Sequence, residues 1–453
     1  MAGKSSKKLG IWTSTSLVVG SMIGAGVFLV PAAMAPFGSV SLLGWIFSAI
    51  GAFFIAKVFS GLSSMVSKSI GGPYAYTRSG FGDFAGFMIA WGYYISIITA
   101  NAAIAISFVS ALSTFFPGLA TNAVAAVATG LGAIWFLSWI NMRGVTTSGR
   151  VQLITSILKL LPLVVISFAG LFFIHAANFH PFNNTGGSVY DAINTTAAIT
   201  LFSFVGIECA TIPAESVENP KKTISRATML GLIICTIVYL LGSVSIMGII
   251  PPEKLAHSPT PYADAAAIIF GNNARYWAGA GMAIAAFGAL NGWTLIQGQL
   301  PYAIARDNLF PPVFGWKNKR GAPFVGILVS STFVSLFMVM NYTRGLVDQF
   351  KILILLSTFT TLVPYLFCAA AYLIVKLKTK REANGKLWAS LLIGILAFAY
   401  SLWAIAGSGQ NTVYYGFLFL MAGIPFYIWV VYRNKNQQST ADEDQDRAEG
   451  RLK

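Results

Sequence analysis

The sequence has few charged residues, few cysteines and few histidines for its length. Only 10% of its 453 residues are charged, whereas about a quarter are charged in a soluble domain. The three cysteines, Cys209, Cys235 and Cys368, lie far apart in apolar stretches, so we expect packing residues and not disulfides or metal ligands. The three histidines are also scattered. The sequence therefore predicts no metal site and no cofactor.

Long apolar runs make up most of the chain. Of all residues, 56% are hydrophobic. A transmembrane helix needs about 20 consecutive, mainly apolar residues. We therefore predict an all-α membrane protein with about twelve transmembrane helices. The runs lie at 11–35, 41–63, 84–112, 122–140, 151–174, 191–213, 227–250, 275–299, 323–341, 348–375, 387–407 and 411–432.

The basic residues are distributed unevenly between the predicted loops. A formal charge of +15 is compatible with nucleic-acid binding, but the Lys and Arg residues concentrate in the N-terminal tail and in alternate loops. The opposite loops hold only Lys254, Arg275, Arg344 and Lys351. This asymmetry follows the positive-inside rule. It predicts a multi-pass protein of the inner (plasma) membrane with both termini in the cytoplasm and no nucleic-acid partner.

Both ends of the chain are polar. Residues 1–10 precede an apolar run that is too long for a signal peptide, so we expect a cytoplasmic tail followed by a retained first span. Residues 433–453 are polar and charged, which predicts a disordered cytoplasmic tail.

The first apolar run contains the segment Gly20-Ser21-Met22-Ile23-Gly24-Ala25-Gly26. Three glycines and a serine should interrupt the helix, and unwound backbone survives at membrane depth only where it is buried in protein or lines a cavity. A half-helix N-terminus offers N–H donors to an anion, and the freed carbonyls accept hydrogen bonds from a cation. The segment therefore predicts a binding site for a zwitterionic amino acid.

A second interruption lies five spans later, in Leu201-Phe202-Ser203-Phe204-Val205-Gly206-Ile207-Glu208. Inverted repeats of five spans place two discontinuous helices opposite each other. We expect residues 11–174 and 191–375 to form the repeats, with 387–432 as two added helices. The alternative is that each glycine cluster is a close packing face between membrane helices.

Two ionisable residues lie at mid-membrane depth. Glu208 falls within the sixth run and Lys159 eight residues into the fifth, or about 12 Å along a helix. Buried charge is costly and indicates function. Because burial disfavours a charged carboxylate, Glu208 is expected to bind protons, unless it is a permanently neutral, hydrogen-bonded group. Lys57 lies nearer a helix end, where its side chain can reach the headgroups.

Several short segments together resemble the amino acid-polyamine-organocation superfamily of transporters. Within it, the sequence is most similar to bacterial arginine/agmatine and related basic amino acid/polyamine antiporters. The resemblance implies the leucine-transporter-type five-plus-five fold with discontinuous helices 1 and 6, alternating access and commonly a homodimer. The segments are Gly24-Ala25-Gly26-Val27-Phe28-Leu29-Val30-Pro31, Gly71-Gly72-Pro73-Tyr74-Ala75-Tyr76, Phe204-Val205-Gly206-Ile207-Glu208, Gly292-Trp293-Thr294 and Leu362-Val363-Pro364-Tyr365.

The resemblance also implies roles for individual residues. Backbone at Ala25 and Gly26 would bind the substrate carboxylate, and carbonyls near Met22 and Val205 would bind its amino group. The residues implied along the substrate side chain are Ser96, Ile97, Asn101, Phe202, Trp293 and Ser357. The residues implied in gating or proton coupling are Tyr74, Tyr93, Lys159, Glu208 and Tyr365.

The residues alone leave other interpretations open for some of these positions. Trp293 can be an ordinary packing residue. Asn101 needs a partner in its apolar span, and that partner can be another helix as well as a substrate. Tyr93 and Tyr365 can be packing aromatics with hydrogen-bonded hydroxyls.

Three positions depart from the arginine/agmatine pattern. Phe202 replaces a tryptophan, and Ala25 replaces a serine whose hydroxyl would help to bind carboxylate. Lys159 is similar to a lysine in another branch, in which an ammonium takes the place of a sodium ion. That branch includes proton-coupled symporters and broad exchangers of neutral amino acids, so these positions leave arginine specificity open.

We therefore expect a secondary amino acid antiporter, with a proton-coupled uptake permease of broad or neutral specificity as the alternative. A sensor would carry an added signalling domain, and a channel would show rings of polar residues along a pore. The sequence shows neither, and it has no nucleophile–base pair or phosphate loop typical of an enzyme. The expected partners are a small amino acid or amine, membrane lipid and a second copy of the chain.

Overall fold

The computed structural model describes residues 10–24, 26–66, 72–143, 159, 161–208, 219–340, 343–379 and 384–433. Within these ranges the chain is helical and contains no β-strand, which confirms the predicted all-α class. Ala25, Cys209 and residues 434–453 lie outside the described residues, so the predictions made for them are not tested.

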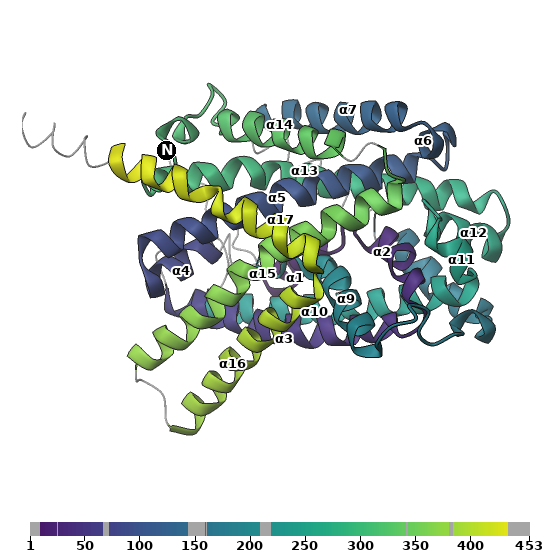
Figure 1. Cartoon of the computed structure of the whole chain (residues 1–453), viewed down its shortest axis with the longest axis horizontal. Coiled ribbons are helices and arrows are strands. Elements are labelled where there is room, and N and C mark those ends of the chain that lie inside the picture. Colours follow the sequence, from purple (N-terminus) through teal and green to yellow (C-terminus); the bar gives the residue numbers. More distant parts are fainter. Residues whose placement is uncertain are drawn as a thin grey trace, which may run out of the picture.

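Figure 1 labels the helices, several of which pack against helices that are far from them in the chain. The α-helices are α1 (Ile11–Met22), α2 (Gly26–Met34), α3 (Ser41–Met65), α4 (Pro73–Phe81), α5 (Asp83–Leu112), α6 (Gly118–Thr121), α7 (Ala123–Met142), α9 (Val189–Leu201), α10 (Pro220–Ile249), α11 (Pro252–Ala256), α12 (Pro261–Phe270), α13 (Ala274–Arg306), α14 (Phe324–Met340), α15 (Leu346–Thr379), α16 (Asn384–Gly407) and α17 (Gln410–Met421). The short 3-10 helices are η1 (Ala35–Phe37), η2 (Gly170–Phe173), η3 (Ala176–Phe179), η4 (Phe202–Phe204) and η7 (Pro312–Gly315).

The helix bounds follow the apolar runs with a few differences. Eight helices in the described part of the chain are long and apolar enough to cross a membrane. α15 extends to Thr379, beyond the expected 375, because Lys376 and Lys378 in its last turn interact favourably with the C-terminal end of the helix. After α17, helical backbone resumes at Gly423 and continues to Arg433, the first residue assigned above to the tail. The count of twelve spans and the inverted repeat stay predictions.

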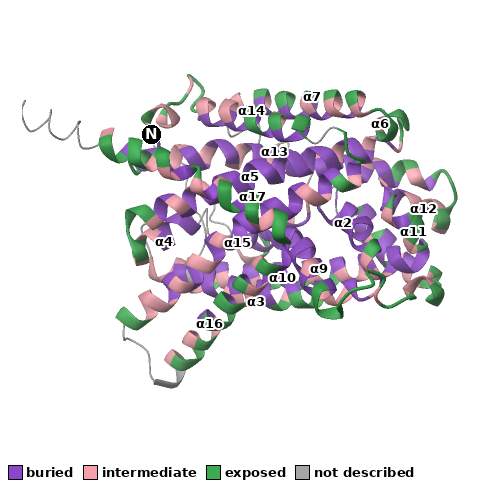
Figure 2. Ribbon diagram, in the orientation of Figure 1, coloured by how far each residue is buried: buried purple, intermediate pink, exposed green. Residues whose placement is uncertain are grey.

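Burial separates a central group of helices from an outer group. α5 is almost entirely buried and packs mainly against α13 and α15, whereas α7, α16 and α17 are much less buried (Figure 2). The outer helices present large apolar side chains such as Phe136, Leu392 and Phe417. An apolar exterior of this extent is unfavourable in water and suits contact with lipid.

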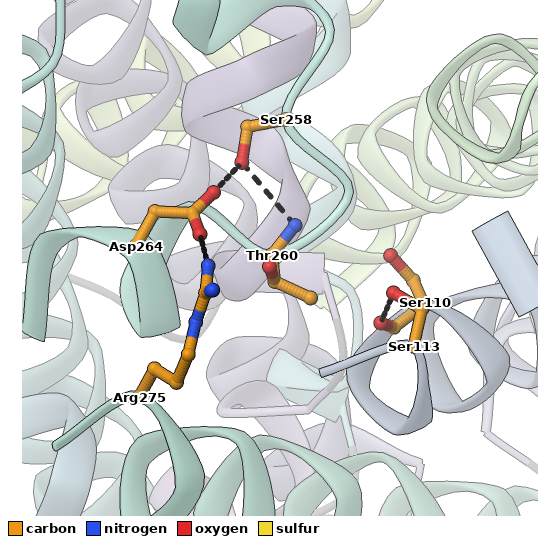
Figure 3. Close-up of polar contacts among 6 residues, drawn as sticks. All are labelled: Ser110, Ser113, Ser258, Thr260, Asp264 and Arg275. Atoms are coloured by element: carbon orange, nitrogen blue, oxygen red, sulfur yellow. Dashed lines mark hydrogen bonds and ion pairs between the residues drawn. The ribbon is translucent and has the colours of Figure 1, made fainter. Parts of the chain in front are cut away.

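The two ends of the molecule differ in their helices. α4 and the C-terminal end of the described chain lie at one end of the long axis, and α11 and α12 lie at the other (Figure 1). At the α11/α12 end, Asp264 accepts a 2.6 Å hydrogen bond from Arg275 and another of 2.6 Å from Ser258 (Figure 3). This cluster connects the beginnings of α12 and α13.

Candidate functional site

The predicted break in the first span is present between α1 and α2. α1 ends at Met22 and α2 begins at Gly26, and the amide of Gly24 donates to the carbonyl of Met22 at 2.9 Å. The ammonium of Lys159, which is fully buried, donates a hydrogen bond to the carbonyl oxygen of Gly20. A cation at this place satisfies a carbonyl near the negative end of α1.

The second predicted break follows α9. Regular helix ends at Leu201, η4 adds one tight turn, and Gly206 has a φ of 107°, which favours glycine. A Cβ atom on Gly206 would lie 3.3 Å from the carbonyl oxygen of Ser21. The Ser21 hydroxyl, which donates to the Val18 carbonyl at 2.9 Å, lies 3.4 Å from the Gly206 carbonyl oxygen. The two breaks are therefore in direct contact, although about 185 residues separate them.

A small cavity of about 20 Å³ lies between the two breaks. Five residues with a predicted role in substrate binding line it, namely Met22, Gly26, Phe202, Val205 and Trp293. The remaining lining residues are Ser21, Gly24, Ala100, Ile104 and Ser203. This volume holds about one water molecule, so the walls must separate before an amino acid can enter.

The other residues predicted to contact substrate lie behind this lining. The hydroxyl of Ser357 donates to the carbonyl of Ser96 at 3.0 Å, and Ile97 is buried in the core. Asn101 donates from Nδ2 to Oε1 of Gln297 on α13 at 2.6 Å. Of the two partners considered for Asn101, the structure thus supplies another helix, while contact with a substrate stays a prediction.

Glu208 joins the second break to two other helices. Its carboxylate accepts hydrogen bonds from the hydroxyls of Tyr93 on α5 and Tyr365 on α15, the latter at 2.8 Å, and from the amide of Gly206 at 3.2 Å. Glu208 is buried, with 1% of its surface exposed. The structure therefore brings together three of the residues predicted to form a gate, and both tyrosine hydroxyls are hydrogen-bonded.

The comparison with protein families decides the class of the molecule. Residues 9–431 match the family described as amino acid permease. The chain belongs to the amino acid permease family. Together with the apolar helices, this membership makes it a membrane transport protein.

The permease is similar to arginine/agmatine antiporters of Chlamydia over nearly its whole length. Those of Chlamydia pneumoniae and Chlamydia felis are each 32% identical to it, over 96% of the permease and 93% and 92% of the relatives. That of Chlamydia caviae is 31% identical, over 96% of the permease and 93% of the relative.

Tyr74 of the permease lies in a different cluster from the other predicted gating residues. Its hydroxyl donates to Oδ2 of Asp307 at 2.8 Å, and Arg78 approaches the same carboxylate at 3.7 Å while bonding Asp83 at 2.6 Å. Burial and the bond to Asp307 raise the pKa of Tyr74 above its ordinary value. Its phenol therefore remains a donor at neutral pH and connects α4 to the end of α13.

Sequence reasoning missed three residues of the permease that the structure places at or near the site. Ser203 lines the cavity, and its buried hydroxyl has no partner among the described residues. Gln297 bonds Asn101, and Asp307 bonds Tyr74. Gln297 follows Trp293 by one helical turn, so the spacing of four residues was a usable signal. Asp307 lies beyond the apolar run and carried no such signal.

Proposed function

We propose that the permease is a secondary active antiporter that exchanges arginine for agmatine, or a related amino acid for its amine, by alternating access. It would work in the inner (plasma) membrane with both termini in the cytoplasm. The observation that carries the proposal is the contact of two broken helices around one cavity with Trp293 in its wall. Broken helices that meet in this way are typical of transporters that bind charged substrates at mid-membrane depth.

The polar groups around the cavity suit the common part of an amino acid. α2 begins at Gly26 beside the cavity, and the first N–H groups of a helix are donors for a carboxylate. Backbone at Met22 and Val205, where regular helix has ended, offers carbonyl acceptors for an ammonium. The face of the Trp293 ring can attract a cationic side chain.

The narrow cavity and the Glu208 cluster support a gated cycle. An amino acid is far larger than the 20 Å³ available, so binding must open the walls and closure must follow. Glu208 holds α5 and α15 beside the second break through Tyr93 and Tyr365. Breaking these bonds would free one side of the site, which is what an inner gate does in alternating access.

The position of Lys159 supports a second candidate function, that of a proton-coupled uptake permease of broad or neutral specificity. Its buried ammonium bonds the backbone of the first break, so a change in its protonation would alter that break directly. The similar Chlamydia proteins are arginine/agmatine antiporters, which supports antiport instead.

A transport assay in proteoliposomes separates the two candidates. Vesicles containing the purified permease are loaded with labelled arginine, and efflux is followed with and without external agmatine or arginine. We expect efflux only when external substrate is present. Accumulation of labelled arginine driven by a pH gradient alone would support the uptake permease and overturn the antiporter. Vesicles without protein provide the control for leakage.

A further inference from the structure

A chain of four buried side chains connects α7, α14, α13 and α5 behind the cavity. Ser138 and Ser331 lie 2.7 Å apart through their hydroxyl oxygens, and Nε2 of Gln297 donates to Ser331 at 2.8 Å. Oε1 of Gln297 accepts from Nδ2 of Asn101 at 2.6 Å. All four side chains are at most 1% exposed.

The direction of each hydrogen bond in this series of side chains is set by its last member, Ser138. Ser138 lies 2.7 Å from the carbonyl of Ile134, which can only accept, so the Ser138 hydroxyl must donate there. Ser331 must then donate to Ser138, and it is left to accept from Gln297. The amide nitrogen of Gln297 therefore faces Ser331, and its oxygen faces Asn101.

The consequence appears at Asn101. Because an oxygen of Gln297 faces it, Asn101 must turn its nitrogen toward α13. Its carbonyl oxygen, Oδ1, is buried and has no partner among the described residues. A buried acceptor without a donor is unfavourable, so Oδ1 is the atom of the Asn101 amide that still requires a hydrogen bond.

The amide pair lies next to the cavity. Gln297 follows Trp293 by four residues on α13, and Asn101 precedes Ile104 by three residues on α5. Residues three or four apart share one face of a helix. Both Trp293 and Ile104 line the cavity, so Asn101 and Gln297 are one turn from it.

We propose that Gln297 is a specificity-determining positioning residue, which holds Asn101 so that its carbonyl oxygen is offered to the substrate side chain. The site then prefers amino acids whose side chains end in N–H donors over those that end only in acceptors. This inference rests on the proposed function, since it concerns the same cavity. Gln297 acts through Asn101.

Binding of matched ligands tests the proposal. Glutamine and methionine sulfoxide are uncharged and have similar shape, but only glutamine has side-chain N–H donors. Their dissociation constants, with those of arginine and citrulline, are measured by isothermal titration calorimetry on the purified permease. We expect the donor ligands to bind at least about tenfold tighter than methionine sulfoxide, as for one buried hydrogen bond. In Gln297→Leu that ratio should fall to within about threefold.

Other variants separate positioning from general damage. Gln297→Glu keeps an oxygen facing Asn101 but has no N–H group to donate to Ser331, so that oxygen is no longer held in place and the ratio should fall. Ser331→Ala removes the acceptor that fixes Gln297 and should reduce the ratio even if Gln297→Leu does not fold. Ser335→Ala, on the same helix, removes a bond to the Ser331 carbonyl and should leave the ratio unchanged.

Two results would overturn the inference: an unchanged ratio in Gln297→Leu or Ser331→Ala, or a wild type that binds methionine sulfoxide as tightly as the donor ligands. Because binding is measured without transport, a permease that shows the preference but does not exchange substrates would contradict only the proposed function. One that exchanges substrates without the preference would contradict only this inference.

Discussion

The two broken helices meet at one cavity, but each is stabilised by a charge of opposite sign. At the first break, the ammonium of Lys159 donates to a carbonyl of α1. At the second, the carboxylate of Glu208 accepts from the amide of Gly206 and from two tyrosines. Freed carbonyls need donors and freed amides need acceptors, so a buried cation and a buried anion each satisfy the backbone group that its break exposes.

Lys159 and Glu208 also differ in the groups to which they are hydrogen-bonded. Lys159 bonds backbone of α1, whereas Glu208 bonds side chains of α5 and α15. Loss of the first charge should damage the site itself. Loss of the second should change how the helices around it open.

The largest effect is expected from Lys159→Ala. Without the ammonium, the Gly20 carbonyl loses a charged donor that is worth about 1.5–3 kcal/mol. Substrate affinity should fall by roughly tenfold to a hundredfold, as that energy implies. Equilibrium binding of labelled arginine to purified protein measures it. Lys57→Ala, a partly exposed lysine on α3, is the matched control. Unchanged binding in Lys159→Ala would reduce Lys159 to a packing residue.

The second largest effect is expected from Trp293→Ala, which removes an aromatic ring from the wall of the cavity between the two breaks. A desolvated cation on an aromatic face gains about 2 kcal/mol or more, so affinity for arginine should fall by about thirtyfold. Affinity for a neutral amino acid such as norleucine should fall much less. The two dissociation constants, compared with wild type, provide the measurement. An equal loss for both ligands would show that the ring serves shape and not charge.

Glu208→Gln should alter the pH dependence more than the maximal rate. Glu208 is the predicted proton-coupling residue, and a glutamine keeps the shape of its side chain but cannot exchange a proton, so exchange measured from pH 5 to pH 8 should vary less than in wild type. Tyr365→Phe removes one donor to the same carboxylate but keeps the carboxyl group itself, which makes it the control. A pH profile identical to that of wild type in Glu208→Gln would exclude Glu208 as the pH-sensitive group.

The smallest effect is expected when one glycine in each break is replaced by alanine. An added Cβ would meet its nearest atom at 3.3 Å in both Gly24→Ala and Gly206→Ala, but only Gly206 has a positive φ. The strain of that backbone costs an alanine about 1–3 kcal/mol. Gly206→Ala should therefore have the lower midpoint of thermal unfolding in detergent. Equal midpoints would mean that the second break adjusts its backbone freely.

The sequence predicted the positions of the two breaks better than the contacts between the helices around them. Glycines and serines interrupt an apolar run locally, so both interruptions were predictable. The helical rise predicted a deep position for Lys159, and the structure shows its contact with the first break. The family resemblance grouped Tyr93, Glu208 and Tyr365, which the structure joins. The pairing of Asn101 with Gln297 depends on how α5 packs against α13. Periodicity within one helix carries no information about such a pairing.

The size of the central cavity has a consequence for the membrane as a whole. Protons and ions cross a protein readily along a continuous file of water, and a space of about 20 Å³ holds about one water molecule. In the described conformation, the space between the two breaks is therefore too small for a file of several water molecules. We expect that a membrane with many copies in this conformation keeps the potential on which other transport depends.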